Sequence, residues 1–212
     1  ARPQTHPPQE AEPRTDYKTI ELTTDITRAG VGRHGIPSIA AVLGMAAVEA
    51  GLYLTQAEVQ GMSQRGGDVQ SHLRLSDKPI SSDLIPIGSC DMILSVEPME
   101  ALRYLPFLAP EGWVITSSKP FENIDDYPAE EALFEEIRKI KNHVILDASA
   151  IAKELGSQKV SNMVMLGAAS DYLGLEPERL EGALHTLFGR KGEEVVQLNI
   201  QALRAGLQGV GI

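Results

Sequence analysis

Short apolar runs of strand length alternate with segments of helical periodicity through the middle of this chain. Residues 91–96, 113–116 and 143–146 are runs of the first kind, and helical segments begin at Pro98 and after Pro128. Strands that alternate with helices predict a mostly parallel sheet with helices on both faces, because each strand-to-strand crossover lays a helix on the sheet. We therefore expect a doubly wound α/β fold.

Beyond residue 146 the pattern is helical only. The expected helices form a C-terminal extension over residues 148–155, 162–172, 178–188 and 193–207. Residues 1–16 carry four prolines among charged residues and few apolar ones, which is typical of a disordered or extended tail. With 42% apolar residues in 212, residues 17–212 are long enough to form a single domain with its own core.

The first half begins with an expected strand over residues 17–30, which is polar for a central strand. An apolar helix is expected over residues 36–51, because Pro37 suits a first helical turn and Gly51 a C-terminal cap. A second strand over residues 52–58 follows. Residues 68–75 alternate polar and apolar side chains and predict a half-exposed strand, with His72 on its polar face as a solvated or hydrogen-bonded histidine.

A glycine turn, Gly30-Val31-Gly32-Arg33-His34-Gly35, joins the first strand to the first helix. Its Gly-x-Gly-x-x-Gly spacing matches the dinucleotide fingerprint, in which backbone N–H groups approach a pyrophosphate. Glu58 lies later than the ribose-binding carboxylate of that fingerprint. The alternative is a tight turn that binds no nucleotide, and Arg33 is then a solvated residue instead of an anion ligand.

A second glycine-rich loop lies between the second and third strands. It presents Arg65, flanked by Ser63 and Gln64, either to an anionic ligand or to a partner subunit. In the alternative, Arg65 pairs with Glu97 and holds two loops together. The loop consists of Gly61, Met62, Ser63, Gln64, Arg65, Gly66 and Gly67.

Glu97 and Glu100 flank Pro98. They are interpreted as first-turn carboxylates favoured by the helix dipole, with a cleft at the strand end as the alternative position of Glu97.

The formal charge of −10, with scattered lysines and arginines, excludes nucleic acid and anionic membranes as expected partners. No apolar run reaches the ~20 residues of a membrane span. Cys90 is the only cysteine, so neither an iron–sulfur cluster nor a zinc cage is expected to be bound by this chain alone. We expect an acidic cytoplasmic protein with no metal site and no catalytic residue of its own.

Four segments together resemble the gamma-type subunit of 2-oxoacid:ferredoxin oxidoreductases, most closely the beta subunit of the indolepyruvate branch. The resemblance runs from about Tyr17 to the C-terminus. Its segments are the glycine turn at residues 30–36, residues 56–69 around Gly-Met-Ser-Gln-Arg-Gly-Gly, residues 97–103 and residues 189–192.

The resemblance implies a complex that decarboxylates an aryl 2-oxoacid with coenzyme A to an acyl-CoA, carbon dioxide and reduced ferredoxin. Thiamine diphosphate, magnesium and iron–sulfur clusters are expected on a larger partner subunit. This chain is then accessory, inactive alone, and expected to form a homodimer when expressed without that partner.

The sequence departs from the family at the glycine turn, where Arg33 and His34 replace a Gly-Gln pair and Pro37 follows. Two alternatives stay open. The first is the gamma subunit of a pyruvate or branched-chain 2-oxoacid oxidoreductase, and the second is a stand-alone nucleotide-binding protein that uses the turn at residues 30–35.

Overall fold

A six-stranded sheet forms the centre of the computed structural model, which describes residues 23–31, 36–60, 68–120 and 126–209. The strand order is β2-β3-β1-β4-β5-β6. Because β3 is antiparallel to both β1 and β2 while the remaining neighbours are parallel, β3 alone among the described strands runs in the opposite direction. The strands are β1 (Thr23–Val31), β2 (Tyr53–Gln60), β3 (Asp68–Ser76), β4 (Cys90–Ser95), β5 (Leu108–Ser117) and β6 (His143–Leu146).

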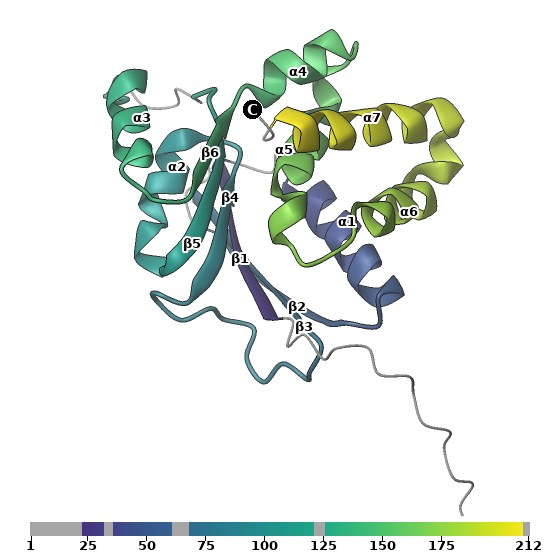
Figure 1. The fold of residues 1–212 in the computed structure, drawn as a ribbon, viewed down its shortest axis with the longest axis horizontal. Coiled ribbons are helices and arrows are strands. Elements are labelled where there is room, and N and C mark those ends of the chain that lie inside the picture. Colours follow the sequence, from purple (N-terminus) through teal and green to yellow (C-terminus); the bar gives the residue numbers. More distant parts are fainter. Residues whose placement is uncertain (1–22, 32–35, 61–67, 121–125, 210–212) are drawn as a thin grey trace, which may run out of the picture.

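Helices cover both faces of this sheet (Figure 1). Helices α2 and α3 lie on one face, and α1 and α5 lie on the other, with α6 and α7 packed outside them. The described helices are α1 (Ile36–Glu49), α2 (Pro98–Arg103), α3 (Glu130–Arg138), α4 (Ala148–Glu154), α5 (Ser161–Ala169), α6 (Pro177–Phe188) and α7 (Glu193–Gly209). The doubly wound fold class with its helical C-terminal extension is confirmed.

Helix ends form where the sequence supplies capping groups. Gly51 adopts a φ of +71°, and the Leu52 N–H then reaches the Ala47 carbonyl at 2.9 Å, which ends α1. At the start of α4 the Asp147 carboxylate accepts from the Ala150 N–H at 2.8 Å. Local chemistry therefore fixes these boundaries, and they lie within two residues of those expected from the sequence.

The core divides into two clusters, one on each side of the sheet. The larger cluster lies under α1 and α5, and the smaller one lies between the sheet and the α2–α3 layer. Every residue of α5 from Met163 to Ala169 is buried, so this helix is covered on all sides. Burial of that apolar surface is the main stabilising contribution of the C-terminal helices.

Two expectations about strands need correction. Strand β1 is central although it is polar, and its buried residues include Asp25 and Arg28. Strand β3 is not half-exposed, because Ser71, His72, Leu73 and Leu75 are all buried and Arg74 is largely covered. The polar face of β3 is packed under the connection to β4, which an alternation pattern does not reveal. Residues 1–22 lie outside the described part, so the tail and the single-domain boundary stay predictions.

The winding of the sheet reverses between β1 and β4. Helix α1, which follows β1, covers one face, while α2, which follows β4, covers the opposite face (Figure 1). In open α/β sheets, ligands bind at the carboxyl ends of the two strands that flank such a reversal. The fold therefore directs attention to the ends of β1 and β4.

Candidate functional site

The carboxyl ends of β1 and β4 lie side by side, with Ala29 in register with Ser95. Buried polar side chains gather along this edge, although a sheet interior is normally apolar. Each must find hydrogen-bond partners, since an unpaired polar group costs free energy when it leaves water. They are Arg28, Ser71, Ser95, Glu97, Thr116 and Ser117.

Both glycine-rich loops expected from the sequence begin at this same edge. Val31, the last residue of β1, pairs with Asp68, and Gln60 at the end of β2 pairs with Val69. Gly30 and Val31 are the members of the two loops within the described residues, and Gly30 lies in β1 opposite Val69. The others lie outside the described residues: Gly32, Arg33, Gly35, Gly61, Met62, Ser63, Gln64, Arg65, Gly66 and Gly67. Their roles stay predictions, but the strands that carry them converge.

Glu97 joins β4 to α2 and is 1% exposed. Its carboxylate accepts the Glu100 N–H at 2.8 Å, which caps α2, and its other oxygen accepts the hydroxyl of Tyr127. The interpretation of Glu97 as a carboxylate at the helix start is confirmed. The expected pair with Arg65 involves a residue outside the described part and stays a prediction.

Tyr127 completes the Glu97 anchor. Burial and the hydrogen bond to the Glu97 carboxylate raise the pKa of Tyr127 above its ordinary value near 10, so the phenol stays protonated and donates at neutral pH. The two side chains come from positions thirty residues apart and tie the end of β4 to the segment beyond residue 125. Glu97 is thus a structural anchor whose two oxygens are both engaged.

Arg28 is a residue of this edge that reasoning from sequence missed. Its side chain is 1% exposed, and its guanidinium donates to the Ser71 hydroxyl on β3. Burial lowers the pKa of Arg28 to about 10, while the negative charge of Glu58 acts in the opposite direction. Ser71 pairs with both Arg28 and Glu58 across the sheet, so the cation lies beside the strands that carry both glycine loops. The only signal in the sequence was the unusual polarity of β1.

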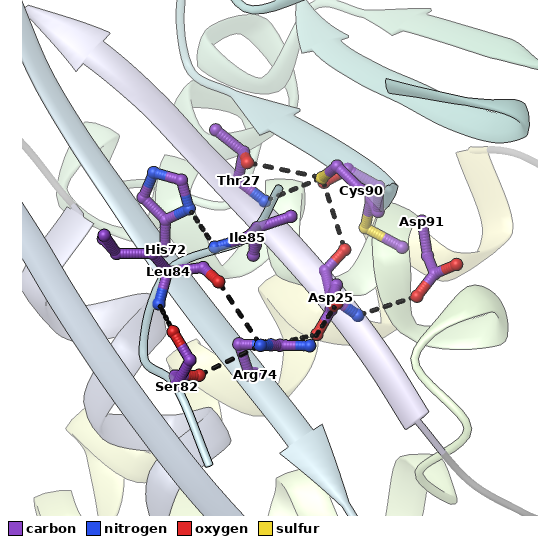
Figure 2. A network of polar contacts seen from close by, with 10 residues as sticks. Asp25, Thr27, His72, Arg74, Ser82, Leu84, Ile85, Cys90 and Asp91 are labelled. Carbon is purple, nitrogen blue, oxygen red and sulfur yellow. Dashed lines mark hydrogen bonds and ion pairs between the residues drawn. The ribbon is translucent and has the colours of Figure 1, made fainter. Parts of the chain in front are cut away.

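A second polar network lies on the α2–α3 face of the same strands, toward the start of β1 (Figure 2). Arg74 binds Asp25 with both arms of its fork, Nε to Oδ1 at 2.8 Å and Nη2 to Oδ2 at 2.9 Å. Its remaining nitrogen donates to the carbonyls of Ser82 and Leu84. The network fastens the connection between β3 and β4 onto the sheet.

His72 belongs to this network (Figure 2). Its Nδ1 accepts the Ile85 N–H at 3.1 Å, and its ring meets Phe107 edge-on with centroids 5.5 Å apart. Burial is the main cause that lowers the pKa of His72, so the ring is neutral at physiological pH. The hydrogen-bonded interpretation is confirmed, and the solvated one is wrong because the side chain is 3% exposed.

Cys90 is buried at the start of β4 and bonded on several sides. Its sulfur accepts the Thr27 N–H at 3.2 Å and lies 2.9 Å from the Met92 carbonyl. Burial raises the pKa of this thiol to about 11, so it is a poor metal ligand and a poor nucleophile. Within the described ranges no three His, Cys, Asp or Glu side chains are placed to hold a metal ion. A lone buried thiol does not fit an iron–sulfur cluster, which is held by several cysteine thiolates.

Residues 25–209 match the family model for pyruvate ferredoxin/flavodoxin oxidoreductase. The chain belongs to this family. It is 33% identical over 192 residues to the indolepyruvate oxidoreductase subunit IorB of Archaeoglobus fulgidus, and the match covers 87% of this chain and 94% of that subunit. It is also 30% identical over 169 residues to the common gamma subunit of the pyruvate/ketoisovalerate oxidoreductases of Pyrococcus furiosus, covering 78% of this chain and 87% of the other.

Solved structures share the fold of this family member. The gamma subunit of a keto/oxoacid ferredoxin oxidoreductase from Geobacter sulfurreducens superposes with a TM-score of 0.65 at 23% identity, covering 88% of this chain and 98% of that one. A 2-oxoglutarate:ferredoxin oxidoreductase from Magnetococcus marinus gives a TM-score of 0.69 at 23% identity. There the match covers 89% of this chain but 31% of the larger chain, so the fold corresponds to one part of that enzyme.

The described part of the edge offers anchored hydrogen-bonding groups. Glu97 is held by two donors, and Arg28 donates within the sheet. The Arg28–Ser71 hydrogen bond joins β1 to β3, the strands next to the loops at residues 32–35 and 61–67, and Glu97 anchors the end of the neighbouring β4. The arrangement suits presentation of loops to a ligand or a partner. No helix in the described part of the chain is both long and apolar enough to cross a membrane.

Proposed function

We propose that this chain is the accessory subunit of an indolepyruvate-type ferredoxin oxidoreductase, which converts an aryl 2-oxoacid and coenzyme A to an acyl-CoA, carbon dioxide and reduced ferredoxin. The observation that carries the proposal is the 33% identity that extends over 94% of the IorB subunit of Archaeoglobus fulgidus. The match to the gamma subunit of Pyrococcus furiosus covers less of both chains, so the pyruvate or ketoisovalerate enzyme is the second candidate.

Thiamine diphosphate, magnesium, the iron–sulfur clusters and the ferredoxin contact belong, in this proposal, to a larger partner subunit. The chemistry of this chain supports that division, because its one cysteine is a buried protonated thiol. The loops at residues 30–35 and 61–67 are the proposed contact with coenzyme A or with the partner. We place the complex in the cytoplasm, with residues 17–212 as one domain, and the acidic charge of −10 is consistent with that compartment.

The direct test is reconstitution. The purified chain is expected neither to decarboxylate indolepyruvate nor to reduce a dye, and activity is expected to appear when the larger partner subunit is added. Activity assays with indolepyruvate, pyruvate and 3-methyl-2-oxobutanoate separate the first candidate from the second. Turnover by the rigorously purified chain alone would falsify the accessory role.

Arg65 gives a residue-level test of the second loop. Arg65→Lys keeps the charge but loses the planar fork, so a ligand or partner contact predicts a roughly ten- to hundredfold loss of reconstituted activity with unchanged thermal stability. A clamp on Glu97 predicts instead a melting temperature several degrees lower, as about 1–2 kcal/mol causes in a domain of this size. Arg138→Lys, at an exposed residue of α3, is the matched control. An unchanged melting temperature together with unchanged reconstituted activity in Arg65→Lys would contradict both the ligand or partner contact and the clamp on Glu97.

A further inference from the structure

A cavity of about 390 Å³ lies among the helices of the larger core cluster. Its walls come from the first turns of α1 and α5, the first two turns of α7, the end of α6 with the turn that follows it, and the turn before α5. Its volume is that of a small-molecule site. The residues that matter below are Ser38, Lys159, Met163, Phe188, Lys191 and Asn199.

The floor of this cavity is apolar with one amide. Met163 and Val160 are buried, and Leu198 lines the wall beside them. Asn199 is 8% exposed, and its Nδ2 donates to the Val195 carbonyl at 2.7 Å. Among the described residues its amide oxygen receives no hydrogen bond, so an acceptor lines an otherwise apolar floor. A flat ring with a polar edge suits such surroundings better than a sugar or a flexible polar chain.

Two lysines stand at the mouth. Lys159 and Lys191 are both exposed, and within the described chain neither forms an ion pair with a carboxylate. Lys191 Nζ lies 5.1 Å from the centroid of the Phe188 ring, which holds the ammonium beside the cavity. The N-terminal ends of α1, α5 and α7 add positive potential at the same place. Glu193 and Glu194 in the first turn of α7 bring two carboxylates nearby, so Lys159 and Lys191 are the cationic side chains that line the cavity itself.

Two segments that are far apart in the sequence meet at this cavity. Ser38 lies in the first turn of the helix that follows the glycine turn at residues 30–35, and Lys191 belongs to Gly189-Arg190-Lys191-Gly192. Asn162 Nδ2 donates to the Ser38 hydroxyl at 3.5 Å and ties the starts of α5 and α1 together. The cavity is therefore assembled from segments far apart in the chain.

We propose that this cavity binds an organic anion, with a planar ring on the floor of Val160, Met163 and Asn199 and a carboxylate or phosphate between Lys159 and Lys191. A nucleotide and an aromatic acid share this chemistry. The site does not depend on the accessory-subunit function, because every group in it belongs to this chain.

The test uses the full chain with isotope-labelled methionine methyl groups, of which there are six. The Met163 signal is assigned with Met163→Leu. Adenosine monophosphate and indoleacetate are titrated to millimolar concentration, each beside its neutral counterpart, adenosine or indole. We expect one of the two anions to shift the Met163 methyl signal and to bind about tenfold more tightly than its neutral counterpart, because the charged group gains the lysine contacts. Which anion does so identifies the source.

Matched variants distinguish binding in this cavity from non-specific attraction of anions to surface lysines. The double variant Lys159→Ala with Lys191→Ala is expected to weaken binding of that anion about tenfold, while Lys153→Ala, on exposed α4 outside the cavity, is expected to leave it unchanged. Both lysines are exposed, so the double variant is expected to fold. An unmoved Met163 signal with both anions, equal binding of the neutral compounds, or undiminished binding by the double variant would each overturn the proposal. No partner subunit is needed, so this result is independent of the reconstitution assay.

Discussion

Asp25 is a charged residue in the central strand β1, and Arg74 on β3 binds its carboxylate with two hydrogen bonds. Asp25 is 7% exposed and Arg74 is 20% exposed at their side chains. Removing one member leaves the other charge buried without its partner, which costs several kcal/mol. We expect Asp25→Ala to lower the free energy of unfolding by about 3 kcal/mol, measured by urea denaturation.

An exposed pair supplies the control for this experiment. Lys141 and Glu111 lie 2.6 Å apart, but their side chains are 70% and 75% exposed. Lys141→Ala is therefore expected to change stability by less than about 0.5 kcal/mol. In the double variant of Asp25→Ala with Arg74→Met, part of the loss should return, because no unpaired charge remains. Equal effects of Asp25→Ala and Lys141→Ala would mean that burial does not set the strength of the first pair.

Cys90 predicts a dependence of stability on alkaline pH. Its pKa is raised from about 9 to about 11 in the folded chain, so between these values the unfolded chain releases the proton while the folded chain retains it. The unfolded state then binds fewer protons, and the free energy of unfolding falls as pH rises, by ~1 kcal/mol between pH 9 and 10 for this group. Urea midpoints at both pH values measure it. Cys90→Ala should show a shallower decline, and an identical decline would assign it to other groups.

At the scale of whole elements, capping residues and periodicity predicted several helix ends, but the helix expected over residues 162–172 ends at Ala169, where a 3-10 turn follows. Pro98 and Gly51 mark ends that the structure confirms. The predictions that were wrong concern side chains that are buried by segments distant in the sequence. Nothing local in β3 shows that the connection to β4 lies over His72, and nothing local in β1 shows that Arg28 finds Ser71 on a neighbouring strand. The glycine loops were recognised by composition, while their common edge required the strand register.

Helices α5 and α7 approach each other through two glycines. A Cβ at Gly167 would lie 1.9 Å from the Leu203 carbonyl oxygen, and one at Gly206 would lie 1.9 Å from the Val164 carbonyl oxygen. Both clashes are with backbone, so the helices would have to separate. We expect Gly167→Ala and Gly206→Ala each to lower stability by about 3 kcal/mol or more, measured by thermal and urea unfolding.

Gly44 in α1 is the matched control for this helix contact. A Cβ at Gly44 meets nothing within 4 Å, and the residue is likewise inside a helix. Gly44→Ala should therefore raise stability by about 0.5–1 kcal/mol, because alanine loses less backbone entropy than glycine on folding. An unchanged melting temperature of Gly167→Ala would show that α5 and α7 can move apart at little cost in free energy, and would contradict the expected loss of stability.

At the scale of the whole molecule, β2 is an edge strand: among the described strands its only neighbour is β3. Tyr53 at its start is 49% exposed, and Val48 just before it is 70% exposed. Apolar side chains beside a free strand edge are typical of a surface that another chain covers.

We therefore expect the chain to self-associate into dimers when expressed alone, in keeping with an isologous contact between copies. Light scattering at tens of micromolar should give about twice the chain mass of 22.9 kDa. Tyr53→Lys places a charge on the β2 edge and should shift the mass toward the monomer, while Lys153→Glu on α4 should not, with circular dichroism unchanged in both.

Addition of the larger subunit should replace the homodimer by a mixed complex if the two partners use the same edge. A monomer at every concentration would contradict the prediction, and a dimer that persists in Tyr53→Lys would assign the contact to a surface other than β2.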